Sequence, residues 1–352
     1  FLPGAREVRD AAAEVRANVP SGIEVVELHG SLPADEQDAA MRPSSNRRIV
    51  VSTNIAETSL TVPGVSAVVD LGLHKVARYD AERAIDSLEL ERISKDAADQ
   101  RAGRAGRLGP GVVFRLWDER DRLRPHREAD IARIDLSGPV LDVLSWGGDP
   151  RTFEWFERPT ADRLEAALDL LTRLGAVERG ALTPIGRRMS TLALHPRLAR
   201  ILIEADGATE AALACAMLSE RQVLPPHAAT TTCDLLAAMD RDVPPHIRRN
   251  ARELQRAFGR TDVRSIDERT LRRALLAGYP DRVAQRRNPG DSRVRLATGH
   301  GGWIGPESGV RSGEFVLALA VEGGRRGDGS EARIRIASIV ERDWLIPTSI
   351  ER

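Results

Sequence analysis

The eight residues from Gln100 to Arg107 carry side chains suited to binding phosphate. Arg101, Arg104 and Arg107 stand three positions apart, and small residues between them let the backbone approach a partner closely. A guanidinium group is always charged and can bind phosphate oxygens through two N–H groups at once. Opening a helix beside a sheet, this cluster can stabilise the charge that develops when a triphosphate held by another domain reacts. The alternative is an arginine-rich surface helix in an arginine-rich protein.

A second polar run, residues 52–61, directly follows Arg48 to Val51, whose β-branched side chains predict a buried strand. Open α/β sheets bind ligands at the carboxyl ends of their strands. Hydroxyl and backbone N–H groups placed there can hold the phosphate oxygens of a nucleic-acid backbone. The alternative is an ordinary strand–turn–helix in which threonine and serine act as caps.

Both runs lie in a segment, residues 1–125, that alternates predicted strands and helices. Strands are predicted at residues 23–28, 48–51, 65–69 and 112–116, and helices at residues 7–19 and 96–108. Strands that alternate with helices imply a parallel sheet built from βαβ units. The first domain is therefore predicted to be of the α/β class.

The remaining residues predict three further domains. In residues 126–194, the leucines of one helical face and a tight turn at residues 178–180 indicate a winged-helix unit, or else a connector that does not touch nucleic acid. Residues 195–287 are predicted to be helical. Residues 288–352 alternate apolar and polar positions between glycine-rich turns, which suggests an antiparallel β-rich module such as a reduced OB-like barrel.

The helical segment is locally basic. Between residues 241 and 287, thirteen arginines stand against six acidic residues, a local net charge of +7. An apolar stripe runs from Ile247 to Phe258 in steps of four and three positions, and Arg248 and Arg252 fall off that stripe. A basic helical surface is the footprint expected for phosphate contacts. The alternative is a solvated face enriched in arginine by codon usage.

Composition narrows the class of protein. The 352 residues suffice for two or three domains, and the net charge of zero confines any nucleic-acid surface to a local patch. The two cysteines lack metal-ligand spacing, which suggests a reducing, cytoplasmic setting, and no metal site is expected. No apolar run reaches the 18 residues that a membrane span needs, so no membrane contact is predicted.

Taken together, the two polar runs resemble motifs V and VI of superfamily 2 helicases in their DEAH-box form. The first four residues, Phe1 to Gly4, resemble motif IV, and Leu28 to Pro33 resembles the RNA-contact loop that follows it. The pattern of residues 130–147 is most similar to the bacterial HrpB-type branch. The resemblance covers roughly residues 1–290 and implies a second RecA-like domain followed by winged-helix and ratchet-like domains.

The resemblance also implies roles at an ATP site between two RecA-like domains. Arg104 and Arg107 would contact the γ-phosphate as arginine fingers, and Gln100 would bind that phosphate or position the attacking water. Arg101 is expected to bind local carboxylates instead of nucleotide. Met41 stands where many DEAH-box enzymes stack adenine on an aromatic ring, so the resemblance implies weak base preference.

Single-stranded nucleic acid is the other implied partner. Gly30 and Ser31, together with Thr53, Asn54 and Thr58, would hold the RNA backbone. Arg248 and Arg252 would line the single-strand path in the ratchet-like domain. The residues leave open whether the substrate is RNA or DNA, and they do not indicate the pathway, the protein partners or the oligomeric state.

Two family motifs are missing from these residues. Neither lysine ends a P-loop, and no Asp-Glu-Ala-His box is present to hold Mg²⁺. ATP and Mg²⁺ would therefore be bound mainly by a first RecA-like domain, and the chain, which starts without Met, is expected to be the C-terminal portion of an ATP-dependent helicase, inactive alone as an ATPase. The alternative is a non-enzymatic nucleic-acid-binding or regulatory platform, but Gln100, Arg104 and Arg107 favour the helicase.

Overall fold

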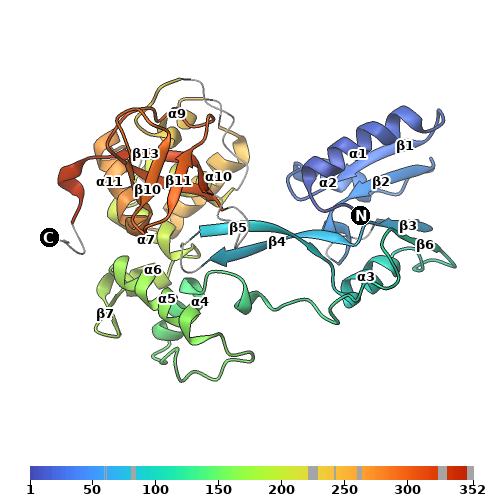
Figure 1. The fold of residues 1–352 in the computed structure, drawn as a ribbon, viewed down its shortest axis with the longest axis horizontal. Helices are drawn as coiled ribbons and strands as arrows, with labels where there is room; N and C mark the ends of the chain where they lie inside the picture. Colours follow the sequence, from blue (N-terminus) through green and yellow to red (C-terminus); the bar gives the residue numbers. More distant parts are fainter. Residues whose placement is uncertain are drawn as a thin grey trace. The chain divides into compact units, whose positions relative to one another are not determined.

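The computed structural model describes residues 1–58, 60, 62–80, 85–220, 229–241, 243–259, 264–323 and 331–346. They form two compact units (Figure 1). The first unit comprises Phe1–Ala77 and Leu88–Ala129, and the second comprises Arg78–Ser87 and Asp130–Arg352.

The first unit contains two pairs of parallel strands. Strand β1 (Glu24–Leu28) pairs with β2 (Arg48–Ser52), and β3 (Ala67–Asp70) pairs with β6 (Val112–Arg115). The start of the chain lies between the pairs, because the main-chain nitrogen of Leu2 donates to Ser52 O at 2.8 Å and that of Phe1 donates to Val69 O at 2.6 Å. The predicted parallel α/β domain is confirmed.

Helices and a hairpin complete this unit. Helices α1 (Ala5–Asn18) and α2 (Ala34–Met41) pack beside β1, and α3 (Lys95–Ala102) packs beside β3. A hairpin of β4 (Leu73–Asp80) and β5 (Ile85–Arg92) leads from β3 toward α3. Each strand of the hairpin is divided between the two units.

The helix predicted at residues 96–108 is shorter than expected. Helix α3 ends at Ala102, residues 103–106 form turns, and a bend follows at Arg107. Glycine costs about 1 kcal/mol relative to alanine inside a helix, and Gly103, Gly106 and Gly109 follow one another at three-residue spacing. The arginine run therefore ends a helix, and the prediction that it opens one is wrong.

Most of the predicted winged-helix segment lies in the second unit. It contains α4 (Ser137–Ser145), α5 (Ala161–Arg173), the short strands β7 (Val177–Glu178) and β8 (Ala181–Leu182), and α6 (Pro184–Ser190). Arg179 and Gly180 join the strands with φ angles of 50° and 79°, the left-handed backbone that a two-residue hairpin turn requires. The four leucines of the predicted helical face, Leu164, Leu168, Leu171 and Leu174, are all buried.

Helices follow as predicted. They are α7 (Pro196–Glu204), α8 (Thr209–Ser219), α9 (Asp234–Met239), α10 (Pro245–Ala257) and α11 (Glu268–Gly278), with the one-turn helices η1 (Asn54–Ala56), η2 (Asp130–Ala132), η3 (Pro280–Arg282) and η4 (Arg342–Trp344) elsewhere in the chain. On α10, Ile247 and Ala251 are buried against the core of this unit, while Leu254 and Phe258 pack at its edge. The predicted apolar stripe is the face that packs on α8.

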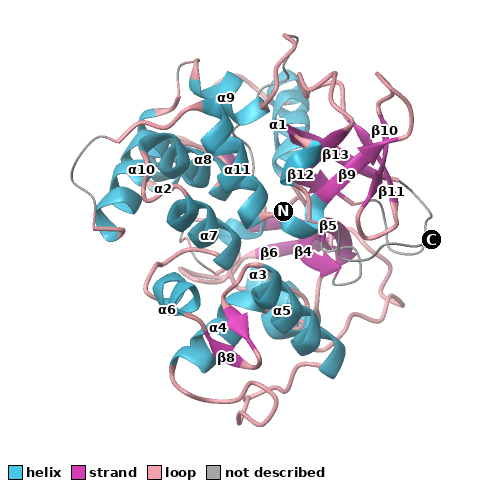
Figure 2. Cartoon of the chain, turned by 90° about the vertical axis from the view of Figure 1, so that its left-hand side faces the viewer, coloured by secondary structure: helices cyan, strands magenta, loops and turns pink. Residues whose placement is uncertain are grey.

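The last segment is a closed five-stranded barrel (Figure 2). Its strands are β9 (Val283–Arg286), β10 (Arg293–Leu296), β11 (Gly301–Ile304), β12 (Phe315–Glu322) and β13 (Ala332–Val340), joined in the order β10–β11–β13–β12–β9. The closed barrel confirms the predicted β-rich module, and its OB-like character stays a prediction. Two details differ: β11 and β13 are parallel, and β9 belongs to the barrel although residues 283–287 were assigned to the helical segment.

Candidate functional site

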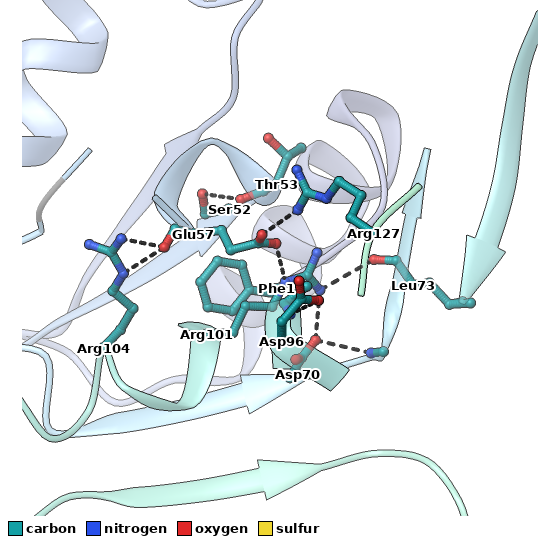
Figure 3. A network of polar contacts seen from close by, with 12 residues as sticks. Phe1, Ser52, Thr53, Glu57, Asp70, Leu73, Asp96, Arg101, Arg104 and Arg127 are labelled. Atoms are coloured by element: carbon teal, nitrogen blue, oxygen red, sulfur yellow. Dashed lines mark hydrogen bonds and ion pairs between the residues drawn. The ribbon is translucent and has the colours of Figure 1, made fainter. Parts of the chain in front are cut away.

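Arg101 is the most deeply buried arginine of the candidate site, with none of its side chain exposed. It belongs to a network of polar contacts (Figure 3). Its Nε donates to Glu57 Oε2 at 2.9 Å, and its Nη1 donates to Asp70 Oδ1 at 2.8 Å. The guanidinium also lies 5.0 Å from the centre of the Phe1 ring. Paired with two carboxylates away from solvent, Arg101 holds the strand ends together, which confirms the expectation that it binds local carboxylates.

Arg104 is also buried, but it binds main-chain oxygens. Its Nε donates to the carbonyl of Glu57 at 2.9 Å, Nη2 donates to the same oxygen, and Nη1 donates to Leu60 O at 3.1 Å. Burial lowers the pKa of Arg104, and the nearby charge of Arg107 lowers it further, although the group stays charged at neutral pH. Arg104 thus clasps the loop that follows β2.

Gln100 and Arg107 face solvent. Gln100 lies in the last turn of α3, and Arg107 lies in the bend beyond it. The turn between them is tightly packed, because a Cβ atom added at Gly111 would stand 2.2 Å from Ala105 O. Gln100 and Arg107 are thus the solvent-exposed members of the predicted catalytic set, whereas Arg104 is buried.

Glu57 contacts three arginines through its side chain and its carbonyl. The sequence analysis did not identify it as a functional residue. Its side chain is buried, with Oε2 accepting from Arg101 and Oε1 accepting from Arg127, while its carbonyl accepts from Arg104. Asp70 was missed as well, and its Oδ1 accepts from Arg101 and from Gly72 N at 3.0 Å. A lone carboxylate inside a hydroxyl-rich run, with several arginines downstream, is the signal that could have identified Glu57.

The residues predicted to hold a nucleic-acid backbone meet at one edge of the β1–β2 pair. Leu28 ends β1 opposite Ser52 at the end of β2, and Leu28 O accepts from Thr53 N at 3.1 Å. Because the strands are parallel, Gly30 and Ser31 follow β1 at the edge where Thr53, Asn54 and Thr58 follow β2.

Their exposure differs. Gly30, Ser31, Asn54 and Thr58 are exposed, whereas Thr53 is buried. Residues 59 and 61 of the polar run lie outside the described residues. The exposed members supply hydroxyl, amide and N–H donors on one edge of the sheet.

The remaining predicted residues stand elsewhere. Met41 is the last residue of α2 and is half-buried. Arg248 and Arg252 are exposed on α10 in the second unit, where Arg248 Nε donates to Val243 O at 3.1 Å. Both arginines project away from the apolar face of α10, as predicted.

The described residues offer neither a metal site nor a membrane span. Within the described ranges, no group of three or more histidine, cysteine, aspartate or glutamate side chains is arranged to hold a metal ion. Nor is any helix of that part of the chain long and apolar enough to cross a bilayer.

Two family models match the chain. Residues 1–109 match the helicase conserved C-terminal domain, and residues 167–194 match the winged-helix helicase associated domain (HA2). The first match covers the arginine run and the loops after β1 and β2. The second covers the end of α5, the β7–β8 hairpin and α6.

Curated relatives and solved structures agree with these matches. The ATP-dependent RNA helicase HrpB of Escherichia coli (strain K12) is 35% identical over 357 residues, covering 98% of this chain and 42% of that protein. The ATP-dependent RNA helicase HrpA of the same organism is 38% identical over 215 residues, covering 58% of this chain and 16% of that protein.

Two crystal structures of E. coli HrpB superpose with TM-scores of 0.80 and 0.84 at 33% and 30% identity, each covering 97% of this chain and 42% and 43% of those chains. The chain thus spans less than half the length of HrpB. The agreement of family models, sequence identity and fold shows that this chain belongs to the DEAH-box helicases of superfamily 2, in their HrpB-type branch, and carries their C-terminal helicase and winged-helix domains.

Proposed function

We propose that this chain is the part of an ATP-dependent RNA helicase that completes the ATP site and grips the RNA. The observation that carries the proposal is the clasp of Arg104 on the carbonyls of Glu57 and Leu60, because it ties the phosphate-binding run to the loop after β2. ATP and Mg²⁺ would be held mainly by a P-loop domain outside these residues, so this chain alone does not hydrolyse ATP.

On the nucleotide side, Arg107 is the arginine finger that is presented to solvent. A guanidinium in this position neutralises charge on the γ-phosphate as the bond to the leaving group breaks. Gln100, four positions before Arg104, binds the same phosphate or orients the attacking water. Met41 offers a flexible thioether in place of a ring, so discrimination among nucleoside triphosphates is low.

Arg104 has a double role in this proposal. A guanidinium carries five N–H groups, and the contacts with Glu57 O and Leu60 O use three of them. One N–H on each Nη remains for a γ-phosphate oxygen. Arg104 can therefore contact the triphosphate while it still holds the loop, so that closure on ATP displaces the neighbouring Thr58.

On the RNA side, the loops after β1 and β2 contact the phosphate backbone through neutral donors. Gly30 and Ser31 act from one loop, and Thr53, Asn54 and Thr58 act from the other. Contacts with phosphate and sugar position the strand without reading its sequence. Arg248 and Arg252 add a charged contact from α10, whose strength depends on salt.

Fluorescence anisotropy of residues 1–352 with labelled single-stranded RNA, without ATP and at two salt concentrations, tests the RNA half. We expect binding that weakens with salt and exceeds binding to duplex RNA. RNA-stimulated ATP hydrolysis by the whole protein tests the proposed role at the ATP site. Salt-sensitive RNA binding without any ATPase activity in the whole protein would favour the alternative of a binding platform, and absence of RNA binding at low salt would refute the grip assigned to this chain.

A further inference from the structure

The loop after β1 contains a histidine that no role has yet explained. His29 is 5% exposed, whereas Ser31, two residues further on, faces solvent. The Ser31 hydroxyl oxygen lies 2.8 Å from Nδ1 of His29, which is hydrogen-bonding distance. The turn between them is fixed, because Leu32 N donates to His29 O at 3.1 Å and Gln37 Nε2 donates to Leu32 O at 2.8 Å.

The surroundings of the other ring nitrogen, Nε2, indicate which atom carries the proton of this hydrogen bond. Nε2 of His29 is buried and has no hydrogen-bond partner among the described residues. A buried N–H without an acceptor is among the rarest defects in folded proteins, whereas an unused acceptor lone pair is tolerated more often. The proton of a neutral ring is therefore placed on Nδ1, where Ser31 accepts it.

Burial favours the neutral form of the His29 ring. Burial lowers the pKa of His29, opposed by the nearby carboxylate of Glu27. A neutral imidazole has one donor nitrogen and one acceptor nitrogen, so the placement of one proton settles both.

This placement matters because phosphate oxygens only accept hydrogen bonds. A serine hydroxyl has one proton to donate and two lone pairs that accept. If Ser31 donated its proton to His29, it would turn lone pairs toward an approaching phosphate and repel it. If Ser31 accepts from His29, its own proton remains for the phosphate.

We propose that His29 is a positioning residue that donates Nδ1–H to Ser31 Oγ and thereby makes Ser31 a hydrogen-bond donor to a backbone phosphate of single-stranded nucleic acid. The proposal rests on the proposed function, since it takes Ser31 as a backbone contact. His29 itself, buried beneath the loop, does not touch the ligand.

Two amide substitutions separate the two ring nitrogens. In His29→Asn, the amide NH₂ can stand close to Nδ1 and donate to Ser31. In His29→Gln, the longer side chain carries its amide toward the Nε2 position and away from Ser31. The two variants thus carry the same amide group and differ only in which ring nitrogen that amide replaces. Thermal unfolding of both variants shows whether they fold.

The measurement is the dissociation constant of the whole protein for labelled single-stranded RNA at fixed salt, for the Asn and Gln variants, for Ser31→Ala and for the double variants. We expect His29→Asn to bind within about twofold of the unchanged protein. His29→Gln and Ser31→Ala should each weaken binding by about tenfold, the effect of one hydrogen bond to a charged group. The double variant His29→Gln/Ser31→Ala should be no weaker than Ser31→Ala alone.

The proposal would be overturned if the double variant lost affinity by the product of the two single losses. It would also be overturned if His29→Gln bound RNA fully while Ser31→Ala bound it weakly. Unchanged binding by Ser31→Ala would also overturn it, by removing Ser31 from the RNA contact. That last outcome is distinguishable from failure of the proposed function, because the α10 arginines and the ATPase assay test the helicase independently of this loop.

Discussion

The guanidinium of Arg104 and the main-chain carbonyl of Glu57 are joined by two hydrogen bonds, one of them from Nε at 2.9 Å. The donor belongs to the run that faces the triphosphate in the proposal, and the acceptor belongs to the loop that faces RNA. A bond from a cation to a backbone oxygen survives side-chain substitution at Glu57, so its geometry is set by the path of the chain. In the proposed function, this contact couples the binding of the triphosphate to the binding of RNA.

Arg107 supplies the first prediction. Arg107→Ala in the whole protein should reduce single-turnover ATP hydrolysis by about 10³–10⁵, the usual contribution of an arginine finger, and should leave RNA affinity unchanged. Arg120→Ala is a suitable control because Arg120 is an exposed arginine of the same unit, paired with Asp118. Retention of more than about a tenth of the hydrolysis rate would remove Arg107 from the finger role.

Glu57 should be central to the stability of the first unit. Glu57→Ala leaves Arg101 buried with one carboxylate in place of two, and breaking a buried pair typically costs about 3–5 kcal/mol. Glu7→Ala is the matched control, since the ion pair of Glu7 with Lys75 is partly exposed and should contribute less than about 1 kcal/mol. Urea unfolding measures both free energies of unfolding, and equal losses would contradict the network described for Glu57.

The turn after α3 leaves no room for a side chain at one glycine. A Cβ at Gly111 would meet Ala105 O at 2.2 Å, whereas a Cβ at Gly109 would meet nothing within 4 Å. Gly111→Ala should therefore displace the segment between Arg104 and Arg107 and lower both the melting temperature and the ATPase rate. Gly109→Ala should leave both near the values of the unchanged protein, and comparable effects of the two substitutions would show that the steric argument is wrong.

Helix α10 gives a prediction about salt. Arg248→Gln together with Arg252→Gln should weaken single-stranded RNA binding and reduce the slope of log affinity against log salt by about 1.4, since each phosphate contact contributes about 0.7. Arg120→Gln with Arg173→Gln removes the same charge from exposed positions and should change the slope little. An unchanged slope in the α10 variant would assign its arginines to a solvated face.

His74 links stability to pH. Burial lowers the pKa of His74 from its usual 6.5 to about 4, and the charges of Arg101 and Arg127 act in the same direction. Between these two pH values the unfolded chain binds a proton that the folded unit does not. The free energy of unfolding therefore falls as pH falls from 6.5 to 4, and this group lowers it no further below pH 4.

The comparison variant is His74→Gln. Titrating carboxylates add their own acid destabilisation to both proteins, so the difference between variants isolates the histidine. Urea unfolding at pH 7 and pH 5 should show a larger loss for the unchanged protein than for His74→Gln. Equal losses of unfolding free energy in the two proteins would mean that His74 is protonated in the folded unit at pH 5.

The sequence by itself determined the classes of structure in this chain. Alternating strand and helix patterns, the leucine face of α5 and the glycine-rich turns of the last segment depend on local spacing, which is set by the period of each element. The motif residues were found in the same way, because short runs of arginine, threonine and serine keep their spacing whatever the fold does.

Only the tertiary structure decided which side chains meet. Glu57 and Arg101 are separated by 44 positions, and no local pattern says that a carboxylate after β2 will neutralise an arginine at the end of α3. The sequence likewise did not predict the length of α3, the inward orientation of Arg104 or the parallel β11–β13 pair. Each depends on burial and on hydrogen bonds between distant segments, whose energies exist only once the chain has packed.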